Sequence, residues 1–301
     1  MKIKEAVKKG YLSANGQRLF RWVPDKWLIF ALYTAATGKL PHLHHPLTFN
    51  EKIQWMKLYD HNPLYTMIAD KYAVRQYVKE KVGEKYLVPL LGKWDSPLEI
   101  DFRGLPQQFV LKCNHDSGGV VICDDRDRFD REAAIKKLQY HYRHNQYYVS
   151  REWAYKDIRK CVTGEKYLID QKVKELRDYK FFCFGGVPQI IQVDFGRQHI
   201  HKRNLYTPDW QFLDFTIKCP NDRKAAIEKP ENLDEMLEVA AKLSRGFLQV
   251  RVDLYSVNGE TYFGEMTLYH GGGIEPFSSQ EYAVKMGNWI DLSKAYGIQN
   301  T

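Results

Sequence analysis

The sequence predicts an α+β protein with a mostly helical N-terminal part and two α+β subdomains. Three observations support this fold class. A capping-box pattern at 48–51 precedes an apolar run with helical spacing. Two short apolar segments, 109–113 and 120–123, flank a glycine turn and indicate strand, turn and strand. Near the C-terminus, the dipeptide Asn258-Gly259 joins two further apolar runs and predicts a β-hairpin.

The other elements follow from end signals and from periodicity. Helices begin at capping residues and often end at glycine, whereas strands are short apolar runs. We expect helices from Pro24-Asp25, over 70–82, over 130–144 and after the pattern Asn232-x-x-Glu235, and strands over 167–173, 180–184, 189–195, 247–255 and 261–268. We divide the chain into a helical N-terminal region (1–105), a first subdomain with the glycine turn (106–172) and a second with the hairpin (173–301).

The composition suits a folded cytoplasmic protein. Of the 301 residues, 44% are hydrophobic, which is enough for a sizeable core. The five cysteines are an odd number without a C-x-x-C pair, and no secretory signal precedes them, so we expect reduced thiols. The apolar stretch 27–33 is too short for a membrane span, which needs about 20 residues. It fits a core helix or, alternatively, docking on the inner membrane face.

The formal net charge of +8 indicates an anionic partner. Nucleotides, acidic glycans, anionic lipids and nucleic acid all carry the required charge. A nucleic-acid-binding surface needs its positive charge gathered in one stripe. In this chain acidic residues are interleaved with the lysines, so we expect no nucleic acid partner.

The final hairpin carries the most specific chemical signal. Its first strand contains Arg251-Val-Asp253, and its second contains Glu265-Met-Thr267. Side chains alternate along a strand, so each pair shares one face. A two-residue turn would place Asp253 and Glu265 on opposite faces, whereas a three-residue loop, or a bulge that corrects the register, would place them on the same face. Two carboxylates on one face, together with phosphate oxygens, form the oxygen ligand set that Mg²⁺ prefers.

A lysine in an apolar strand is the second signal. Lys112 lies in the middle of the segment 109–113, where burial without a partner is costly. A phosphate bound by the amides of Ser117, Gly118 and Gly119 would supply that partner. The alternative is an edge strand whose lysine faces water. The extended segment 165–168 is a third candidate, because backbone groups beside an acid can bind an adenine ring.

These motifs resemble the ATP-grasp ligases. Arg-x-Asp and Glu-x-Thr before the glycine loop 270–273 are similar to the end of that fold, where Glu-x-Asn is usual. Asp70-Lys71, followed by Gly83 and Val88-Pro89, is similar to another stretch of it. More closely, nearly the whole chain resembles the teichuronopeptide-biosynthesis (TupA-like) ATP-grasp family. The stretches that carry this resemblance are LTFNEKIQW (47–55), FVLKCNH (109–115), REWAY (151–155) and DYKFFCF (178–184).

The resemblance implies an enzyme that uses ATP and Mg²⁺, with Arg251 and Lys112 as catalytic residues. Arg251 would stabilise the charge that develops during phosphoryl transfer. Thr267 stands where the family usually has asparagine, and a hydroxyl is a poorer metal ligand than an amide oxygen. The expected ATP-binding residues are Lys71, Lys112, Ser117, Gly118, Gly119, Glu165, Lys166, Leu168 and Lys180; the expected metal ligands are Asp253, Glu265 and Thr267; the expected substrate-binding residues are Lys202, Arg203, His270, Gly271 and Gly272.

The implied reaction joins a carboxylate and an amine through an acyl phosphate, with ADP as a product. The resemblance suggests a uronic acid of a cell-surface polysaccharide as the carboxylate and an amino acid as the amine. The alternative is a glycosyltransferase that uses a nucleotide sugar, because Asp125-Arg-Asp127 has the form of a D-x-D metal motif. Its charged surroundings indicate a solvated turn instead. His42-x-His44-His45 lacks a plausible fourth ligand and indicates a polar loop.

Overall fold

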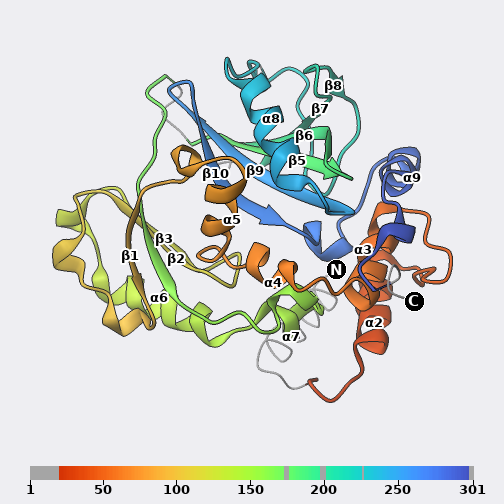
Figure 1. Ribbon diagram of the computed structural model, residues 1–301, viewed down its shortest axis with the longest axis horizontal. Coiled ribbons are helices and arrows are strands. Elements are labelled where there is room, and N and C mark those ends of the chain that lie inside the picture. The colour runs from red at the N-terminus through yellow and green to blue at the C-terminus, as the bar shows by residue number, and fades with distance from the viewer. Residues whose placement is uncertain (1–19, 173–175, 197–200, 226, 298–301) are drawn as a thin grey trace. The chain divides into compact units, whose positions relative to one another are not determined.

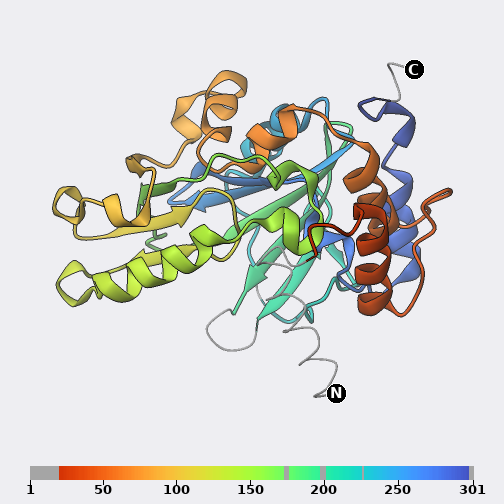
Figure 2. The same ribbon diagram turned by 90° about the horizontal axis from the view of Figure 1, so that it is seen from below.

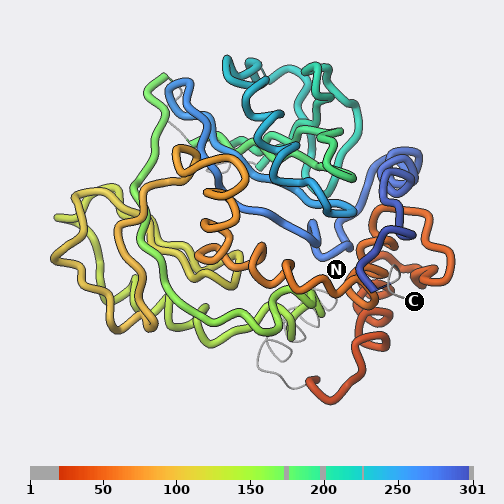
Figure 3. The backbone as a smooth tube through the Cα atoms, viewed as in Figure 1, coloured from red at the N-terminus to blue at the C-terminus, as the bar shows by residue number. Residues whose placement is uncertain are grey.

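The structure is a computed structural model that describes residues 20–172, 176–196, 201–225 and 227–297. The described chain divides into two compact units (Figures 1 and 3). The first unit contains residues 20–31, 63–74 and 88–167, and the second contains 32–62, 75–87 and the described residues from 168 to 297. Residues from the expected N-terminal region therefore contribute to both units, and the three-part division stays a prediction.

The first unit is built on a four-stranded antiparallel sheet. The strands are β1 (Leu90–Trp94), β2 (Phe109–Cys113), β3 (Val120–Cys123) and β4 (Val162–Lys166), in the order β1-β4-β2-β3. Helix α6 (Arg131–Arg143) runs along this sheet (Figure 2). Leu138 of α6 is fully buried against Phe109 and Leu111 of β2. The antiparallel pairing of β2 and β3 confirms the predicted strand, turn and strand.

The second unit is built on a six-stranded antiparallel sheet in the order β10-β9-β5-β6-β7-β8. Its strands are β5 (Asp178–Phe184), β6 (Val187–Phe195), β7 (Lys202–Tyr206), β8 (Phe212–Leu213), β9 (Gln249–Val257) and β10 (Glu260–Thr267). Helix α8 (Leu233–Ser244) packs on β5, β6 and β9 (Figure 1). Helices α3 (Phe49–Tyr59) and α9 (Gln280–Asn288) contact each other.

The remaining helices are short or connect the units. They are α2 (Asp25–Thr37), α4 (Leu64–Ala69), α5 (Val74–Lys81) and α7 (Gln146–Ser150), with short 3₁₀ helices that include η1 (Glu84–Tyr86), η4 (Arg126–Arg128), η5 (Trp153–Tyr155) and η6 (His270–Gly273). In α2, Leu28 and Ile29 are buried, as in the core-helix interpretation of the stretch 27–33. None of the helices in the described ranges combines the length and the apolar composition that crossing a bilayer requires.

Two helix caps and one strand show where local rules hold and where they do not. The capping box of α3 forms as expected: Thr48 accepts from the amide of Glu51, whose carboxylate accepts from the amide of Thr48. The predicted cap of α8 does not form, because the Asn232 side chain instead bonds Thr261 and Ser256 of the hairpin. The strand predicted over 167–173 is wrong for the described residues up to 172, since the strand there, β4, ends at Lys166.

Asn114 ties three segments of the first unit together. Its side-chain amide donates to Oδ1 of Asp70 at 2.8 Å and to the carbonyl oxygen of Arg159 at 2.9 Å. Its oxygen accepts from the amide of Cys161 at 2.8 Å. Asn114 is fully buried and its partners Asp70 and Cys161 are buried, so these groups would lose a hydrogen bond without access to water.

We expect Asn114→Ala to lower the free energy of unfolding by about 2–4 kcal/mol, because it leaves buried polar groups on two other segments without a hydrogen-bond partner. Urea unfolding followed by tryptophan fluorescence measures the loss. Gln108→Ala is the matched control: this carboxamide is exposed and donates to one carbonyl oxygen, so the change should stay below about 0.5 kcal/mol. Equal effects of the two substitutions would contradict the role of Asn114.

Candidate active site

The hairpin of β9 and β10 brings the predicted metal ligands to one face of the sheet. The turn has two residues, Asn258 and Gly259, both at positive φ (52° and 82°). Such a turn alone would place Asp253 and Glu265 on opposite faces. A register shift between Phe263 and Glu265 leaves Gly264 unpaired, and beyond it Asp253 lies directly opposite Glu265. The expected common face is confirmed, and a β-bulge produces it.

Gly264 is suited to this bulge because a side chain has no room there. A Cβ atom at Gly264 would lie 3.0 Å from the carbonyl oxygen of Asp253 and 3.1 Å from the ring of Tyr255. Both distances are shorter than ordinary carbon contacts. The close approach of the two strands therefore selects glycine at the position that resets the register.

Arg251 is the centre of the cluster. Its Nε donates to Oδ1 of Asp253 at 2.6 Å and its Nη2 to Oδ2 at 2.7 Å, so the pair is bidentate. The same Nη2 lies 3.2 Å from Oε1 of Glu265 and 3.0 Å from Oγ1 of Thr267. Oxygens of Asp253, Glu265 and Thr267 thus surround a single nitrogen atom. Arg251 is only 8% exposed, whereas the Glu265 side chain is 33% exposed.

Lys180 of β5 adds a second cation to this face. It is the register partner of Asp253, and its Nζ lies 2.6 Å from Oδ2 of that carboxylate. Asp178, two residues earlier on the same strand, also accepts from Lys180. Burial alone would lower the pKa of Lys180, but Asp178 and Asp253 outweigh this effect and raise it. Burial raises the pKa of Asp253, and Arg251 and Lys180 oppose that shift.

The donor set fits a magnesium ion that has further oxygen ligands. Two carboxylates and a hydroxyl are hard oxygen ligands, and their oxygens already converge on a positively charged group. Across the described ranges, no group of three or more His, Cys, Asp or Glu residues could hold a metal. Asp253, Glu265 and Thr267 would therefore need phosphate or water oxygens to complete the coordination.

The first unit holds all but one of the other predicted ATP-binding residues. Lys112 of β2 pairs with Glu165 of β4, with 2.5 Å between Nζ and Oε2. Their side chains are 17% and 10% exposed. Lys112 does have a charged partner, as its apolar neighbours led us to expect, but in this structure the partner is a carboxylate. Lys166, at the end of β4, is exposed. Leu168 follows in the second unit and is half-buried.

The glycine turn between β2 and β3 lies beside Lys71. Lys71 Nζ donates to the carbonyl oxygen of Asp116 at 2.7 Å. Oδ1 of Asp116 accepts from the amides of Gly118 at 3.2 Å and Gly119 at 2.7 Å. Oδ2 of Asp116 lies 2.5 Å from Nδ1 of His141. A carboxylate therefore occupies two of the three amides that we expected to bind a phosphate, while Ser117 and Gly118 remain exposed.

The second glycine loop, η6, is fixed by helix α3. Lys57 Nζ donates to the carbonyl oxygen of Gly272 at 2.6 Å, and Gln54 donates to the same oxygen at 2.9 Å. Sequence reasoning missed both residues, because nothing in the sequence of α3 indicates which loop its polar side chains contact. It also missed Asp178, although strand alternation places Asp178 on the same face as Lys180.

The predicted substrate-binding residues of β7 are already paired with acids. Lys202 lies 2.6 Å from Asp222. Arg203 is buried, 2.9 Å from Asp194 and 3.1 Å from Glu275. They belong to a basic run from 199 to 203 that could contact phosphates or an acidic acceptor. Its residues 199 and 200 lie outside the described residues, and His201 lies 3.1 Å from Asp194. Substrate contact by Lys202, Arg203, Gly271 and Gly272 stays a prediction.

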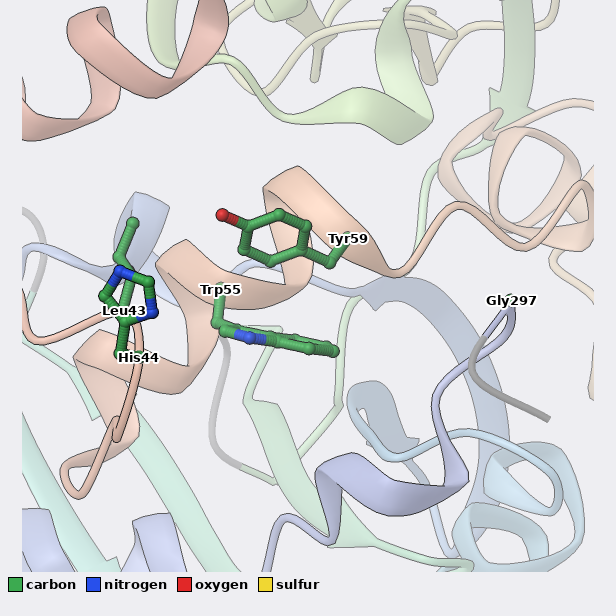
Figure 4. A pocket seen from close by; sticks show the side chains of 5 residues that line it. All are labelled: Leu43, His44, Trp55, Tyr59 and Gly297. Carbon is green, nitrogen blue, oxygen red and sulfur yellow. The ribbon is translucent and has the colours of Figure 1, made fainter. Parts of the chain in front are cut away.

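The D-x-D motif and a hollow on α3 do not join the candidate site. The D-x-D motif forms the turn η4, in which Asp125 accepts from the amide of Asp127 and from Arg128, as the solvated-turn interpretation expects. A hollow of about 440 Å³ lies on α3 and is lined by Leu43, His44, Trp55, Tyr59 and Gly297 (Figure 4). No predicted site residue is among them.

Comparison with known proteins identifies a family for this chain. A family model described as TupA-like ATPgrasp matches residues 51–291. No curated protein matches the sequence. Among solved structures, the D-alanine–D-alanine ligase from Bacillus anthracis is 16% identical, with a TM-score of 0.45 over 80% of this chain and 72% of that chain. The N5-carboxyaminoimidazole synthetase from Staphylococcus aureus complexed with ADP is 15% identical, with a TM-score of 0.41 over 76% and 52%.

The identification rests on the family match, because it spans most of the chain and includes the hairpin with Arg251, Asp253 and Glu265. The α+β fold with two antiparallel sheets agrees with it. The chain belongs to the TupA-like ATP-grasp family, and it is an ATP-grasp ligase.

Proposed function

We propose that the protein joins an amino acid to a uronic acid of a cell-surface polysaccharide or its precursor, in the cytoplasm, through an acyl phosphate. The observation that carries this proposal is the convergence of Arg251, Asp253, Glu265 and Thr267 on one face of the second sheet. Such a cluster suits phosphoryl transfer, which depends on positioning and on neutralising charge rather than on a protein nucleophile. The glycan and the amino acid come from the family resemblance and from the basic net charge.

The reaction activates a poor electrophile. A carboxylate oxygen attacks the γ-phosphorus of ATP, the bond between that phosphorus and the bridging oxygen breaks, and ADP leaves. The amine then attacks the acyl carbon of the resulting acyl phosphate. The carbon–oxygen bond breaks, phosphate leaves, and the nitrogen loses a proton to form the amide. Lys71 and Lys112 would bind the phosphates, and Arg251 would stabilise the charge that moves during transfer.

Asp253, Glu265 and Thr267 would hold the magnesium ion, which when bound would neutralise phosphate charge. Glu165, Lys166 and Leu168 would bind the adenine ring, and Lys180 would contact a phosphate. In this proposal Lys112 exchanges the carboxylate of Glu165 for a phosphate when ATP binds. That exchange keeps the lysine charged and paired throughout, as its apolar surroundings require.

A peripheral membrane location is the second part of the proposal. Trp22 and Trp27 are 77% and 66% exposed, and exposed basic residues, Arg21 and Lys26, lie beside them. Indole rings favour the membrane interface, and basic residues favour anionic headgroups. An enzyme bound to the membrane in this way would act on a membrane-linked glycan precursor.

The activity assay is release of ADP with Mg²⁺ and a panel of uronic acids and amino acids. We expect ADP release that requires one carboxylate and one amine, and we expect Glu265→Gln to reduce kcat at least about 100-fold while the unfolding free energy changes by less than about 1 kcal/mol. Glu260→Gln on the same strand is the control, since this exposed acid bonds only Tyr262 among the contacts described. Full activity of Glu265→Gln, or transfer from a nucleotide sugar, would refute the proposal.

Nucleotide binding is tested by the midpoint of thermal unfolding. ATP with Mg²⁺ at about 100 times its dissociation constant stabilises the native state by about 2.7 kcal/mol, which raises the midpoint by about 5 °C. A uridine diphosphate sugar should raise it far less. Lys112→Gln should lose more than half of the ATP shift. Lys93→Gln in the same sheet removes an equal charge from a surface ion pair with Asp95 and should keep the shift. Equal shifts in the two variants would remove Lys112 from the site.

Membrane association is tested by sedimentation with vesicles of phosphatidylcholine and phosphatidylglycerol. We expect the protein to bind the anionic vesicles at low salt and to lose most of this binding in the double variant Trp22→Ser/Trp27→Ser. Leu98→Ser replaces another exposed apolar residue of the first unit, 70% exposed, and should bind like the unmodified protein. Binding that persists in the double variant would exclude this surface.

A further inference from the structure

The histidine that follows β10 is buried in the second unit. His270 is 2% exposed, and its ring packs against Phe182 at 4.8 Å between ring centroids and against Phe49 at 6.5 Å. We expected this residue to bind substrate, but in this structure protein side chains enclose the ring. Any contribution of His270 to the reaction therefore has to pass through a neighbouring residue.

That neighbour is Arg251. Its Nη1 donates to Nδ1 of His270 at 2.7 Å. A guanidinium has no acceptor, so Nδ1 must be the acceptor and cannot carry a proton. The imidazole is then neutral, with its single proton on Nε2. Burial lowers the pKa of His270 to about 4, which agrees with a neutral ring.

The second ring nitrogen faces an acid. Nε2 of His270 lies 3.2 Å from Oε2 of Glu275, within ion-pair distance but without the alignment of a hydrogen bond. Glu275 is fixed in turn by Arg203 at 3.1 Å and by Lys218 at 2.7 Å. The donor at Nδ1 determines the tautomer, and the negative charge of Glu275 near Nε2 favours a proton on that nitrogen.

The glycine loop makes the approach of Glu275 possible. Gly271 has φ of +56°, and a Cβ atom there would lie 2.2 Å from Cγ of Glu275. The Cβ atom of any other residue at this position would collide with the Glu275 side chain, which would then have to move from its place near His270. Glycine at this position therefore serves the contact between Glu275 and the histidine, whether or not the loop also contacts a substrate.

We propose that His270 is a positioning residue that fixes the guanidinium of Arg251 for phosphoryl transfer. Nε and Nη2 of Arg251 face Asp253, Glu265 and Thr267, which are also the candidate metal ligands. Nη1 turns to the interior and is anchored there by His270. This role rests on the proposed function, because it assigns Arg251 to the charge that develops during the reaction.

Two substitutions separate positioning from packing. His270→Phe keeps an aromatic ring between Phe49 and Phe182 but removes the acceptor for Arg251. We expect kcat to fall about 10- to 100-fold, with KM for ATP within about threefold, because misplacing a charged group affects the transition state more than binding. His270→Gln offers an oxygen to Arg251 and an amide proton to Glu275, so it should restore kcat to within about fivefold of the unmodified protein.

Nitrogen-15 NMR of labelled histidine gives a readout that does not depend on activity. At neutral pH, His270 should show a neutral ring with the proton on Nε2, and Glu275→Gln should weaken that preference. A proton on Nδ1, or a charged ring, would overturn the inference even if His270→Phe fails to fold.

The kinetic outcomes distinguish the two proposals. An active protein in which His270→Phe changes kcat by less than twofold would overturn the positioning role alone. An unmodified protein that never consumes ATP with any carboxylate and amine would overturn the proposed function, and the positioning role with it. Loss of kcat in His270→Phe with recovery in His270→Gln supports both.

Discussion

The arrangement of side chains in the candidate site depends on the pairing of buried charges on one face of the second sheet. Charged groups in a protein interior must be paired, because removing one partner leaves an uncompensated charge away from water. Arg251 and Asp253 form a bidentate pair, and Lys180 contacts the same carboxylate. Through His270 the pairing continues to Glu275 and Arg203, and from Arg203 to Asp194. One connected set of polar contacts therefore joins β5, β6, β7, β9, β10 and the loop after them.

This connection gives the site its rigidity. Arg251 is restrained on both sides, by carboxylates toward the surface and by a neutral histidine toward the interior. A guanidinium held in this way needs little rearrangement when negative charge moves near it, which is the condition for electrostatic stabilisation of a transition state. The first unit holds a separate ion pair, between Lys112 and the carboxylate of Glu165. In the proposed function this lysine would exchange one anionic partner for another.

The sequence predicted the parts of the fold that local physics determines. The apolar runs 109–113 and 120–123, the capping box at Thr48 and the Asn258-Gly259 turn all form as expected, because neighbouring residues decide them. The cap at Asn232 failed because Thr261 and Ser256 compete for its side chain, and no local rule includes such partners. The segment after Lys166 was apolar enough for a strand, yet it lies beyond the end of β4.

The same distinction applies to the site. Strand alternation is enough to place Arg251 with Asp253, and Glu265 with Thr267. It cannot decide whether the two pairs meet, because that depends on a bulge at Gly264, and a glycine in a strand fits several structures. The contacts of Lys57 and Gln54 with Gly272 join residues far apart in the chain. Side-chain type alone does not indicate such contacts.

Because of the bulge at Gly264, the number of residues in the second strand of the hairpin decides which side chains reach the candidate site. Glu265 and Met266 point to opposite faces, one to the charged cluster and the other, 3% exposed, to the apolar core. Loss or gain of a single residue between 260 and 264 would exchange them, placing a thioether beside Arg251 and a carboxylate in the core. Changes in pairs would keep both faces. Insertions or deletions in this strand are therefore expected only in multiples of two residues. A search for relatives, or an engineered graft of the hairpin, should keep the strand length within that restriction.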